Sequence, residues 1–310
     1  MIVTLTPNPS VDRTVEVAAL LRGEVLRATG GRVDPGGKGV NVSRALAAHA
    51  VATRAVLPIG GAVGRQLVDL LEPVGIEVVQ VSIHGDVRAN VSVVEPDGSV
   101  TKLNELGPTL SATETDALVQ ATVRASGGAA WTVLSGSLPP GCPVDLYATL
   151  LSLLPGPVAV DTSGEPLGKA LPARPHLVKP NREELAEVSG LPVHTVGQAV
   201  TAARSLVERG ARAVLASLGA DGAVLVTDTD AWFAESPVDA PISSVGAGDA
   251  ALAGFLAAGG AGPEALRRAL AWGSAAVRLP GSRMPGPNDL DLSAVQLAVN
   301  VPYERHLKGQ

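Results

Sequence analysis

The chain has 310 residues, of which 46% are hydrophobic and 17% charged, and these proportions exclude a disordered segment. Its net charge of −6 comes without basic runs, and its only aromatic residues are three Trp, two Tyr and two Phe, so a nucleic-acid partner is not expected. Cys142 is the single cysteine, so no intrachain disulfide can form.

Residues 1–5 open directly into a strand-like apolar run with no basic segment before it, so we expect no signal peptide. The longest apolar stretch, residues 250–262, is too short to span a bilayer. We therefore expect a cytoplasmic protein with no membrane partner.

Short apolar strands alternate with helix-length segments along most of the chain. The expected strands are residues 2–5, 55–59, 132–135, 158–161, 177–179, 213–217 and 223–227. The expected helices are residues 40–50, 64–71, 112–124, 143–153, 182–189, 196–208 and 249–258. This alternation predicts an α/β fold in which a mostly parallel central sheet is covered by helices on both faces.

Two regions break the alternation and predict a small antiparallel sheet outside the main one. Residues 13–17 alternate polar and apolar, and residues 24–29 form a second strand-like piece. Residues 90–95 and 100–103 flank a Pro-Asp-Gly-Ser turn and indicate a hairpin. We expect one domain, residues 1–310, with a lid formed by residues of approximately 12–30 and 88–104.

A glycine-rich octapeptide, residues 243–250, runs into an apolar helix-like segment. Backbone N–H groups between Gly246 and Gly248 can converge at the positive end of this helix and form an anion hole. Asp249 then lies where it could take a proton from an attacking hydroxyl. The structural alternative is a helix start, with a tight glycine turn and Asp249 as a cap.

Two loops near the amino terminus carry groups that suit a polar ligand. Residues 34–41 form a glycine-rich loop that lacks the Walker order, although its glycines allow close backbone approach and Lys38 adds a positive charge. Asp12 follows the first strand, where its carboxylate could accept bonds from sugar hydroxyls. A turn with a solvated lysine and a capping Asp is the alternative for these loops.

Two further loops also follow expected strands. Asn181 and Glu184 match a capping box, but Glu184 could instead orient a water on Mg²⁺. Residues 217–223 could hold a nucleotide phosphate or simply form a hairpin. The five histidines have no metal-ligand spacing, and no Gly-x-Ser-x-Gly elbow of a serine hydrolase is present.

Taken in this order, the motifs resemble those of the ribokinase-like, or PfkB-type, carbohydrate kinase family from end to end. The matching segments are Asn8-Pro9-x-x-Asp12, Pro35-Gly36-Gly37-Lys38-Gly39-x-Asn41, Leu134-Ser135-Gly136-Ser137-Leu138-Pro139, Asp161-Thr162-Ser163-Gly164-Glu165, Lys179-Pro180-Asn181-x-x-Glu184, Ser217-Leu218-Gly219 and Val245-Gly246-Ala247-Gly248-Asp249. The first, third and fourth of these look more like the hexose-phosphate kinase branch. The resemblance implies a ribokinase-like three-layer α/β/α fold, with a small β-sheet lid that often clasps the lid of a second subunit in a homodimer.

The same resemblance implies roles for individual residues. Asp249 would be the base. The anion hole for the transferred phosphoryl group would be Gly246, Ala247 and Gly248. The sugar would be held by Asp12, Gly37, Lys38 and Asn41. The phosphate already on the substrate would meet Lys38 and Arg88, with Ser137 as a weaker candidate. Asn181 and Glu184 would serve the Mg²⁺–ATP phosphates, with Glu184 acting on the metal through water. The nucleotide site would be lined by Lys179, Ser217, Gly219 and Gly222.

The resemblance therefore implies ATP- and Mg²⁺-dependent phosphorylation of a ketohexose phosphate. Fructose 1-phosphate, converted to fructose 1,6-bisphosphate, is the expected substrate, and tagatose 6-phosphate and fructose 6-phosphate remain alternatives. The fixed charges of Lys38 and Arg88 suit a substrate that already carries a phosphate. A catalytically silent sugar-phosphate-binding regulator is the alternative from a different functional class.

Overall fold

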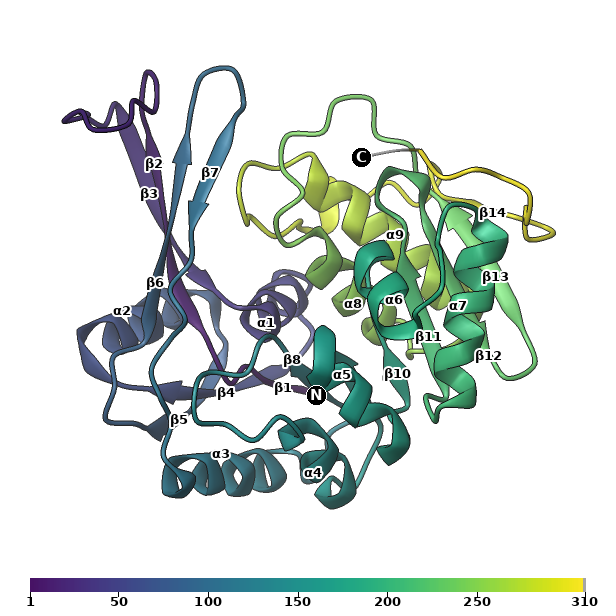
Figure 1. The fold of residues 1–310 in the computed structure, drawn as a ribbon, viewed down its shortest axis with the longest axis horizontal. Helices are drawn as coiled ribbons and strands as arrows, with labels where there is room; N and C mark the ends of the chain where they lie inside the picture. Colours follow the sequence, from purple (N-terminus) through teal and green to yellow (C-terminus); the bar gives the residue numbers. More distant parts are fainter. Residues whose placement is uncertain (309–310) are drawn as a thin grey trace.

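The computed structural model describes residues 1–308, and its main feature is a ten-stranded sheet (Figure 1). In spatial order the strands are β14 (Gln296–Leu297), β13 (Ala231–Glu235), β12 (Ala223–Thr227), β11 (Ala213–Ser217), β10 (Leu177–Val178), β9 (Val158–Asp161), β8 (Trp131–Ser135), β1 (Ile2–Leu5), β4 (Thr53–Ile59) and β5 (Glu77–Ser82). The seven strands from β11 to β5 pair in parallel, whereas β12, β13 and β14 are antiparallel additions at one edge. The predicted α/β fold with a mostly parallel sheet is confirmed.

Helices cover both faces of this sheet, as alternate strand residues show. In β1, Val3 and Leu5 belong to one core cluster and Ile2 to another. The cluster of Val3 includes side chains of α3 (Ala112–Ala125), α4 (Leu146–Leu153), α5 (Gly164–Ala170), α6 (Arg182–Ser189) and α7 (Val196–Glu208). The opposite face packs against α1 (Lys38–Ala48), α2 (Gly61–Leu71), α8 (Ala247–Ala257) and α9 (Gly262–Val277). Short 3-10 turns at Glu72–Val74, Leu171–Ala173, Gly219–Asp221 (η3) and Pro287–Asp289 complete the described elements.

A separate four-stranded sheet forms the lid and rises away from the α/β body (Figure 1). Its spatial order is β3 (Gly30–Gly36), β2 (Ser10–Glu16), β6 (Arg88–Val94) and β7 (Val100–Leu103). β2 and β6 pair in parallel, so the expectation of a purely antiparallel sheet was wrong. This pairing follows from the topology, because both strands leave the main sheet in the same direction.

The second lid strand was also misplaced. Residues 24–29 were expected to be a strand, but they lie in the loop between β2 and β3, where Val25 is 93% exposed. The strand begins at Gly30, which pairs with Glu16. Its register is fixed by the partner strand and not by its own apolar pattern, which is why glycine-rich residues were not expected there.

Two helices and three strands of the main body were not among the expected elements: α5, α9, β5, β13 and β14. The buried face of α9 consists of alanines together with Leu266 and Trp272. Small residues weaken the contrast between faces on which a periodicity argument depends. Within residues 1–308, no helix has both the length and the apolar character needed to cross a bilayer.

Candidate functional site

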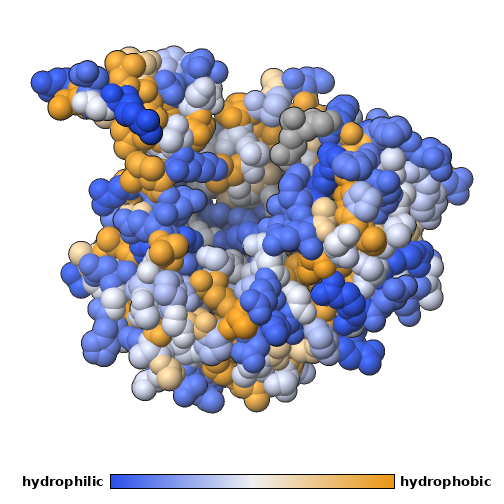
Figure 2. Space-filling model, viewed as in Figure 1, coloured by the Kyte–Doolittle hydropathy of each residue, from blue (hydrophilic) through white to orange (hydrophobic). Residues whose placement is uncertain are grey.

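The parallel strands from β1 to β11 end at one edge of the sheet, beneath the lid. The molecule is hollowed between the lid and its C-terminal half, and hydrophilic residues line the floor of this hollow (Figure 2). Ligands of open parallel sheets bind at this edge, where loops follow the carboxyl ends of the strands. Most of the expected site residues lie there.

Asp161 ends β9 and is fully buried between two lysines. Its Oδ1 lies 2.7 Å from Lys38 Nζ, and its Oδ2 lies 3.2 Å from Lys179 Nζ. Burial opposes the charged form of Asp161, but the two ammonium groups outweigh it and hold the pKa of this carboxyl below its ordinary value. Burial likewise opposes the charge of Lys38, but Asp161 and Glu184 raise the pKa of the lysine overall.

Asp249 lies in the first turn of α8 and is also buried. Its Oδ2 accepts a hydrogen bond of 2.8 Å from Asn41 Nδ2. Burial, and then the negative charge of Asp161, raise the pKa of Asp249 to about 6. A carboxylate with such a pKa is ionised at neutral pH and is a stronger base than an exposed Asp, so it suits proton abstraction from a hydroxyl.

The helix start beside Asp249 leaves backbone donors free. Gly246 caps the helix with a φ of +78°, and the first i to i−4 bond runs from Ala250 N–H to the carbonyl of Gly246 (2.8 Å). The N–H groups of Gly248 and Asp249 come before this bond and have no helical acceptor. Ala247 differs from Gly248 because its N–H donates to the carbonyl of Ser244 over 3.3 Å.

Lys179 adds a positive charge at the same place. A Cβ on Gly248 would lie 3.3 Å from Lys179 Nζ, so the lysine head group lies directly beside the free backbone donors. The end of α8 and Lys179 together can hold an anion next to Asp249. This is the geometry that phosphoryl transfer needs.

Arg88 and Ser137 meet at a second place, on either side of Asn8. Asn8 Nδ2 donates to Ser137 Oγ (3.3 Å), and Arg88 donates to the backbone carbonyls of Asn8 (3.0 Å) and Glu105 (3.0 Å). Arg88 and Ser137 line one cavity of about 480 Å³. Lys38 was expected to meet the same phosphate as Arg88, but it does not line this cavity. Its ammonium group is paired with Asp161 instead.

Asp12 and Gly37 lie where the lid joins the body. Asp12 Oδ1 accepts hydrogen bonds from Ser10 Oγ (2.7 Å) and Asn90 Nδ2 (2.9 Å). Gly37 precedes α1 with a φ of +111°, and a Cβ there would approach Thr6 Cγ2 to 2.8 Å. Both the backbone angle and the close packing therefore require glycine at position 37.

Asn181 and Glu184 form the capping box that their spacing predicts. Glu184 N–H donates to Asn181 Oδ1 (2.8 Å), and Asn181 N–H donates to Glu184 Oε2 (2.9 Å). The other oxygen, Oε1, faces Lys38 Nζ at 3.4 Å. Capping therefore uses one carboxylate oxygen and leaves the other directed at the site.

The segment after β11 is a hairpin, as one of its two interpretations predicted. Ser217 ends β11 beside Asn181, while Gly219 begins the η3 turn and Gly222 follows it, directly before β12. A Cβ on Gly222 would overlap the carbonyl of Ala234. Hairpin geometry thus explains this glycine, and a nucleotide role for the segment stays a prediction.

Sequence reasoning assigned no role to Asp161, Asn8, Asn90 or Arg44, although all four contact site residues. Asp161 carried a usable signal, because it is the last residue of an expected buried strand and a charge there ends at the ligand edge. The others depend on contacts between distant segments. Asn90 reaches Asp12 only because β6 pairs with β2.

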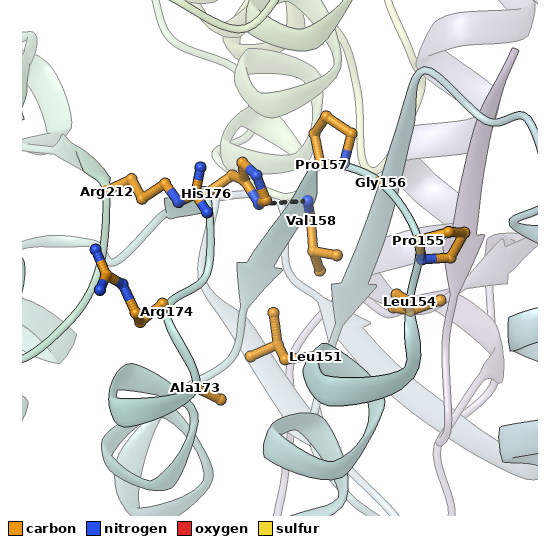
Figure 3. Close-up of a pocket in the computed structure, with 10 residues that line it drawn as sticks. All are labelled: Leu151, Leu154, Pro155, Gly156, Pro157, Val158, Ala173, Arg174, His176 and Arg212. Carbon is orange, nitrogen blue, oxygen red and sulfur yellow. Dashed lines mark hydrogen bonds between the residues drawn. The ribbon is translucent and has the colours of Figure 1, made fainter.

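Another cavity, of about 460 Å³, lies at the opposite edge of the sheet (Figure 3). Val158 and His176 line it, and Val158 N–H donates to His176 Nδ1 over 3.3 Å. Val158 begins β9, whereas Asp161 ends it. Since no expected site residue lines this cavity, the chemistry of the side chains, and not the presence of a hollow, identifies the candidate site.

Comparisons with known proteins agree with this geometry. Residues 6–289 match the model of the pfkB family carbohydrate kinases. The chain is 40% identical to the 1-phosphofructokinase of Haloferax volcanii, covering 94% of this chain and 95% of that protein. It is 38% identical to the 1-phosphofructokinase of Bacillus subtilis, covering 83% and 85%. The structure of phosphofructokinase-2 from Escherichia coli in complex with potassium superposes with a TM-score of 0.87 at 33% identity, covering 93% of this chain and 96% of that one. The chain is a carbohydrate kinase and belongs to the pfkB family.

Proposed function

We propose that this kinase transfers the γ-phosphoryl group of ATP to the free primary hydroxyl of fructose 1-phosphate, giving fructose 1,6-bisphosphate and ADP. The observation that carries the proposal is the buried carboxylate of Asp249, with a pKa of about 6, beside the free backbone donors of α8. In this reaction Asp249 takes the hydroxyl proton, the hydroxyl oxygen bonds to the γ-phosphorus, and the bridging oxygen leaves with ADP.

The donors around Asp249 support a phosphoryl group at this position. The N–H groups of Gly248 and Asp249 have no helical acceptor, and the ammonium of Lys179 lies beside them, so together they would stabilise charge on the equatorial oxygens. Asp161 pairs with Lys179 and fixes its place. These groups are preorganised, so little rearrangement is needed when charge develops.

The residues present fit an Mg²⁺ ion that is bound together with a nucleotide, because such an ion needs few ligands from the protein. Such an ion takes most of its ligands from phosphates and water and needs only one or two carboxylates. Within residues 1–308 no group of three or more metal-ligating side chains occurs, so a cage made by the protein alone is not available. We propose that Glu184 Oε1, which is free of the capping box, accepts from a water on the ion. When bound, the ion would neutralise charge on the transferred phosphate.

The choice of substrate rests on two supports. The relatives from B. subtilis, H. volcanii and Rhodobacter capsulatus, which are 37–40% identical to this chain, are named 1-phosphofructokinases. The cavity with Arg88 and Ser137 offers donors for a phosphate at a distance from Asp249. Fructose 6-phosphate is the second candidate, because the E. coli 6-phosphofructokinase isozyme 2 is 33% identical over 93% of this chain. Tagatose 6-phosphate remains a third.

An ADP-release assay with MgATP and each of the three sugar phosphates tests this proposal, with the substrates compared by kcat/KM. A clear preference for fructose 1-phosphate is expected. Preference for a 6-phosphate would keep the mechanism and overturn the named substrate. Thermal stabilisation by a sugar phosphate without turnover of any of them would identify a silent binder instead.

We also propose that two copies pair through their lids. The outer strands β3 and β7 have free edges, and apolar side chains of the lid are exposed: Val33, Val100 and Leu103. Unpaired edges with apolar residues favour association. Sedimentation equilibrium of the full chain should give a dimer mass, and a monomer at micromolar concentration would contradict this.

A further inference from the structure

Arg44 is a partly buried cation one helical turn beyond Asn41 on α1. Its Nη1 donates to three neutral oxygens: Asn41 Oδ1 (3.1 Å), the carbonyl of Pro35 (3.3 Å) and Ser282 Oγ (3.4 Å). Within residues 1–308 no carboxylate lies within 4.0 Å of its guanidinium. Arg44 therefore spends its hydrogen bonds on neutral oxygens beside the site and not on an ion pair, which points to a role in holding those groups.

The contacts of Arg44 fix which way the amide of Asn41 points. Asn41 lies between Arg44, which can only donate hydrogen bonds, and the carboxylate of Asp249, which can only accept them. The amide oxygen must therefore face Arg44, and the amide nitrogen must face Asp249. Without Arg44 the carboxylate alone would still attract the amide nitrogen, but the amide oxygen would lose the contact that holds the side chain in place.

The held amide in turn fixes the orientation of Asp249. Asn41 Nδ2 donates a hydrogen bond of 2.8 Å to Asp249 Oδ2, whereas Asp249 Oδ1 makes no hydrogen bond within the described residues. The free oxygen is the one that can meet a substrate hydroxyl. A chain of two hydrogen bonds thus connects Arg44 to the carboxylate whose other oxygen, Oδ1, is left to accept the proton.

We propose that Arg44 is a positioning residue for phosphoryl transfer, which acts through the amide of Asn41 to orient the carboxylate of Asp249. This inference rests on the proposed role of Asp249 as base. Arg44 has no assigned contact with either substrate. Its effect should therefore fall on kcat and on the pH profile, with little effect on KM for ATP.

The charged groups around this chain set the sign of the pH effect. Arg44 faces the carboxylates of Asp12, Asp34 and Asp249. Asp249 also faces Asp161 of β9, Lys38 of α1 and Lys179, which follows β10. Loss of the Arg44 charge removes a cation that favours ionised Asp249, so the acid limb of the kcat profile should move to higher pH.

The test compares R44Q, R44K and a control variant, R54Q, in the full-length enzyme. Arg54 is also a partly buried arginine that donates to a backbone carbonyl, that of Ala125, but it lies at the amino end of β4. For R44Q we expect kcat to fall roughly 10- to 100-fold, as misplacement of a reacting group does, with KM for ATP within about twofold. R44K keeps the charge, so its acid limb should stay at the native pH although kcat remains reduced. R54Q should leave both kcat and the acid limb of the kcat profile unchanged.

A double variant separates positioning from general damage. If Arg44 acts through Asn41, R44Q should have little further effect on kcat in an N41A background, because the link is already broken. Full additivity of the two losses, or an unmoved acid limb in R44Q, would overturn the proposal. If R44Q does not fold, R44K decides: native kcat in R44K would refute a role for the guanidinium geometry. D249N reports on the base separately, since near-native kcat in D249N overturns the base and this inference together.

Discussion

Lys179 and Asp161 form an ion pair that is almost completely removed from water, with Nζ 3.2 Å from Oδ2. The lysine follows β10 and the aspartate ends the neighbouring β9, so the parallel sheet itself brings them together. Asp161 also holds Lys38, and its charge raises the pKa of Asp249. One carboxylate thus connects the proposed anion site to the proposed base.

The first prediction concerns removal of this carboxylate. D161N should move the acid limb of the kcat profile to lower pH, because the negative charge that opposes ionisation of Asp249 is gone. It should also lower the free energy of unfolding by about 3–5 kcal/mol, since Lys179 remains buried without its partner. Urea unfolding and kcat between pH 5 and 8 measure both effects. An acid limb that moves to higher pH would contradict this account of the site.

A second prediction follows from the burial of Asp249. Its folded-state pKa of about 6 lies above the ordinary value of 3.8, so the native state binds a proton more tightly than the unfolded chain. The stability that comes from protonated Asp249 is present below pH 3.8 and is lost as the pH rises through 6. D249N keeps a neutral side chain at all pH values and should therefore be more stable than the native enzyme at pH 8, by on the order of 1–2 kcal/mol.

The same variant should lower kcat by roughly 10²- to 10⁴-fold while it still binds sugar phosphate and nucleotide. Calorimetric titration with each ligand is the control for binding. For the native enzyme kcat should fall as the pH drops below about 6, where Asp249 takes up its proton. Near-native kcat in D249N would remove this residue as the base.

Much of this site could be predicted from the sequence, because its parts lie in loops that follow recognisable strands. The helix start at Gly246 beside Asp249 and the capping box of Asn181 with Glu184 each depend on a few consecutive residues. Asp161 was visible as a strand-ending carboxylate, but its partners were not. Lys38 lies 123 residues from it, and only the strand order brings the two together.

The errors in the fold have the same physical origin. The register of β3 depends on pairing with β2, and the parallel pairing of β2 with β6 depends on how the lid leaves the main sheet. Neither the register nor the direction of pairing can be predicted from the apolar periodicity of a single segment. Arg44 was missed because nothing in its neighbours along the chain indicates that Ser282 would lie against it.

A third prediction compares two glycines at opposite ends of α8. Gly246 and Gly259 both have positive φ, of +78° and +98°. A Cβ at Gly246 would lie 2.7 Å from Met284 Cε, whereas a Cβ at Gly259 would meet nothing within 4 Å. Both G246A and G259A should cost about 1–2 kcal/mol of stability from backbone strain, but only G246A should lower kcat, because it displaces the helix start beside Asp249. Equal kcat losses would argue that helix stability alone matters.

The last prediction concerns the cavity of Arg88 and Ser137. Arg88 is the first residue of the lid strand β6 and donates to the carbonyls of Asn8 and Glu105. Burial lowers the pKa of its guanidinium. R88A should raise KM for the sugar phosphate by roughly 10- to 100-fold, the loss of about 1.5–3 kcal/mol expected for a charge-assisted hydrogen bond, while KM for ATP barely changes. R13A is the control, because Arg13 is an exposed arginine of the same lid that only reaches Gln66 at 3.5 Å. If R88A raised KM equally for the sugar phosphate and for ATP, the arginine would instead hold the lid against the body through those two carbonyls. The phosphate of the sugar would then have to be bound elsewhere.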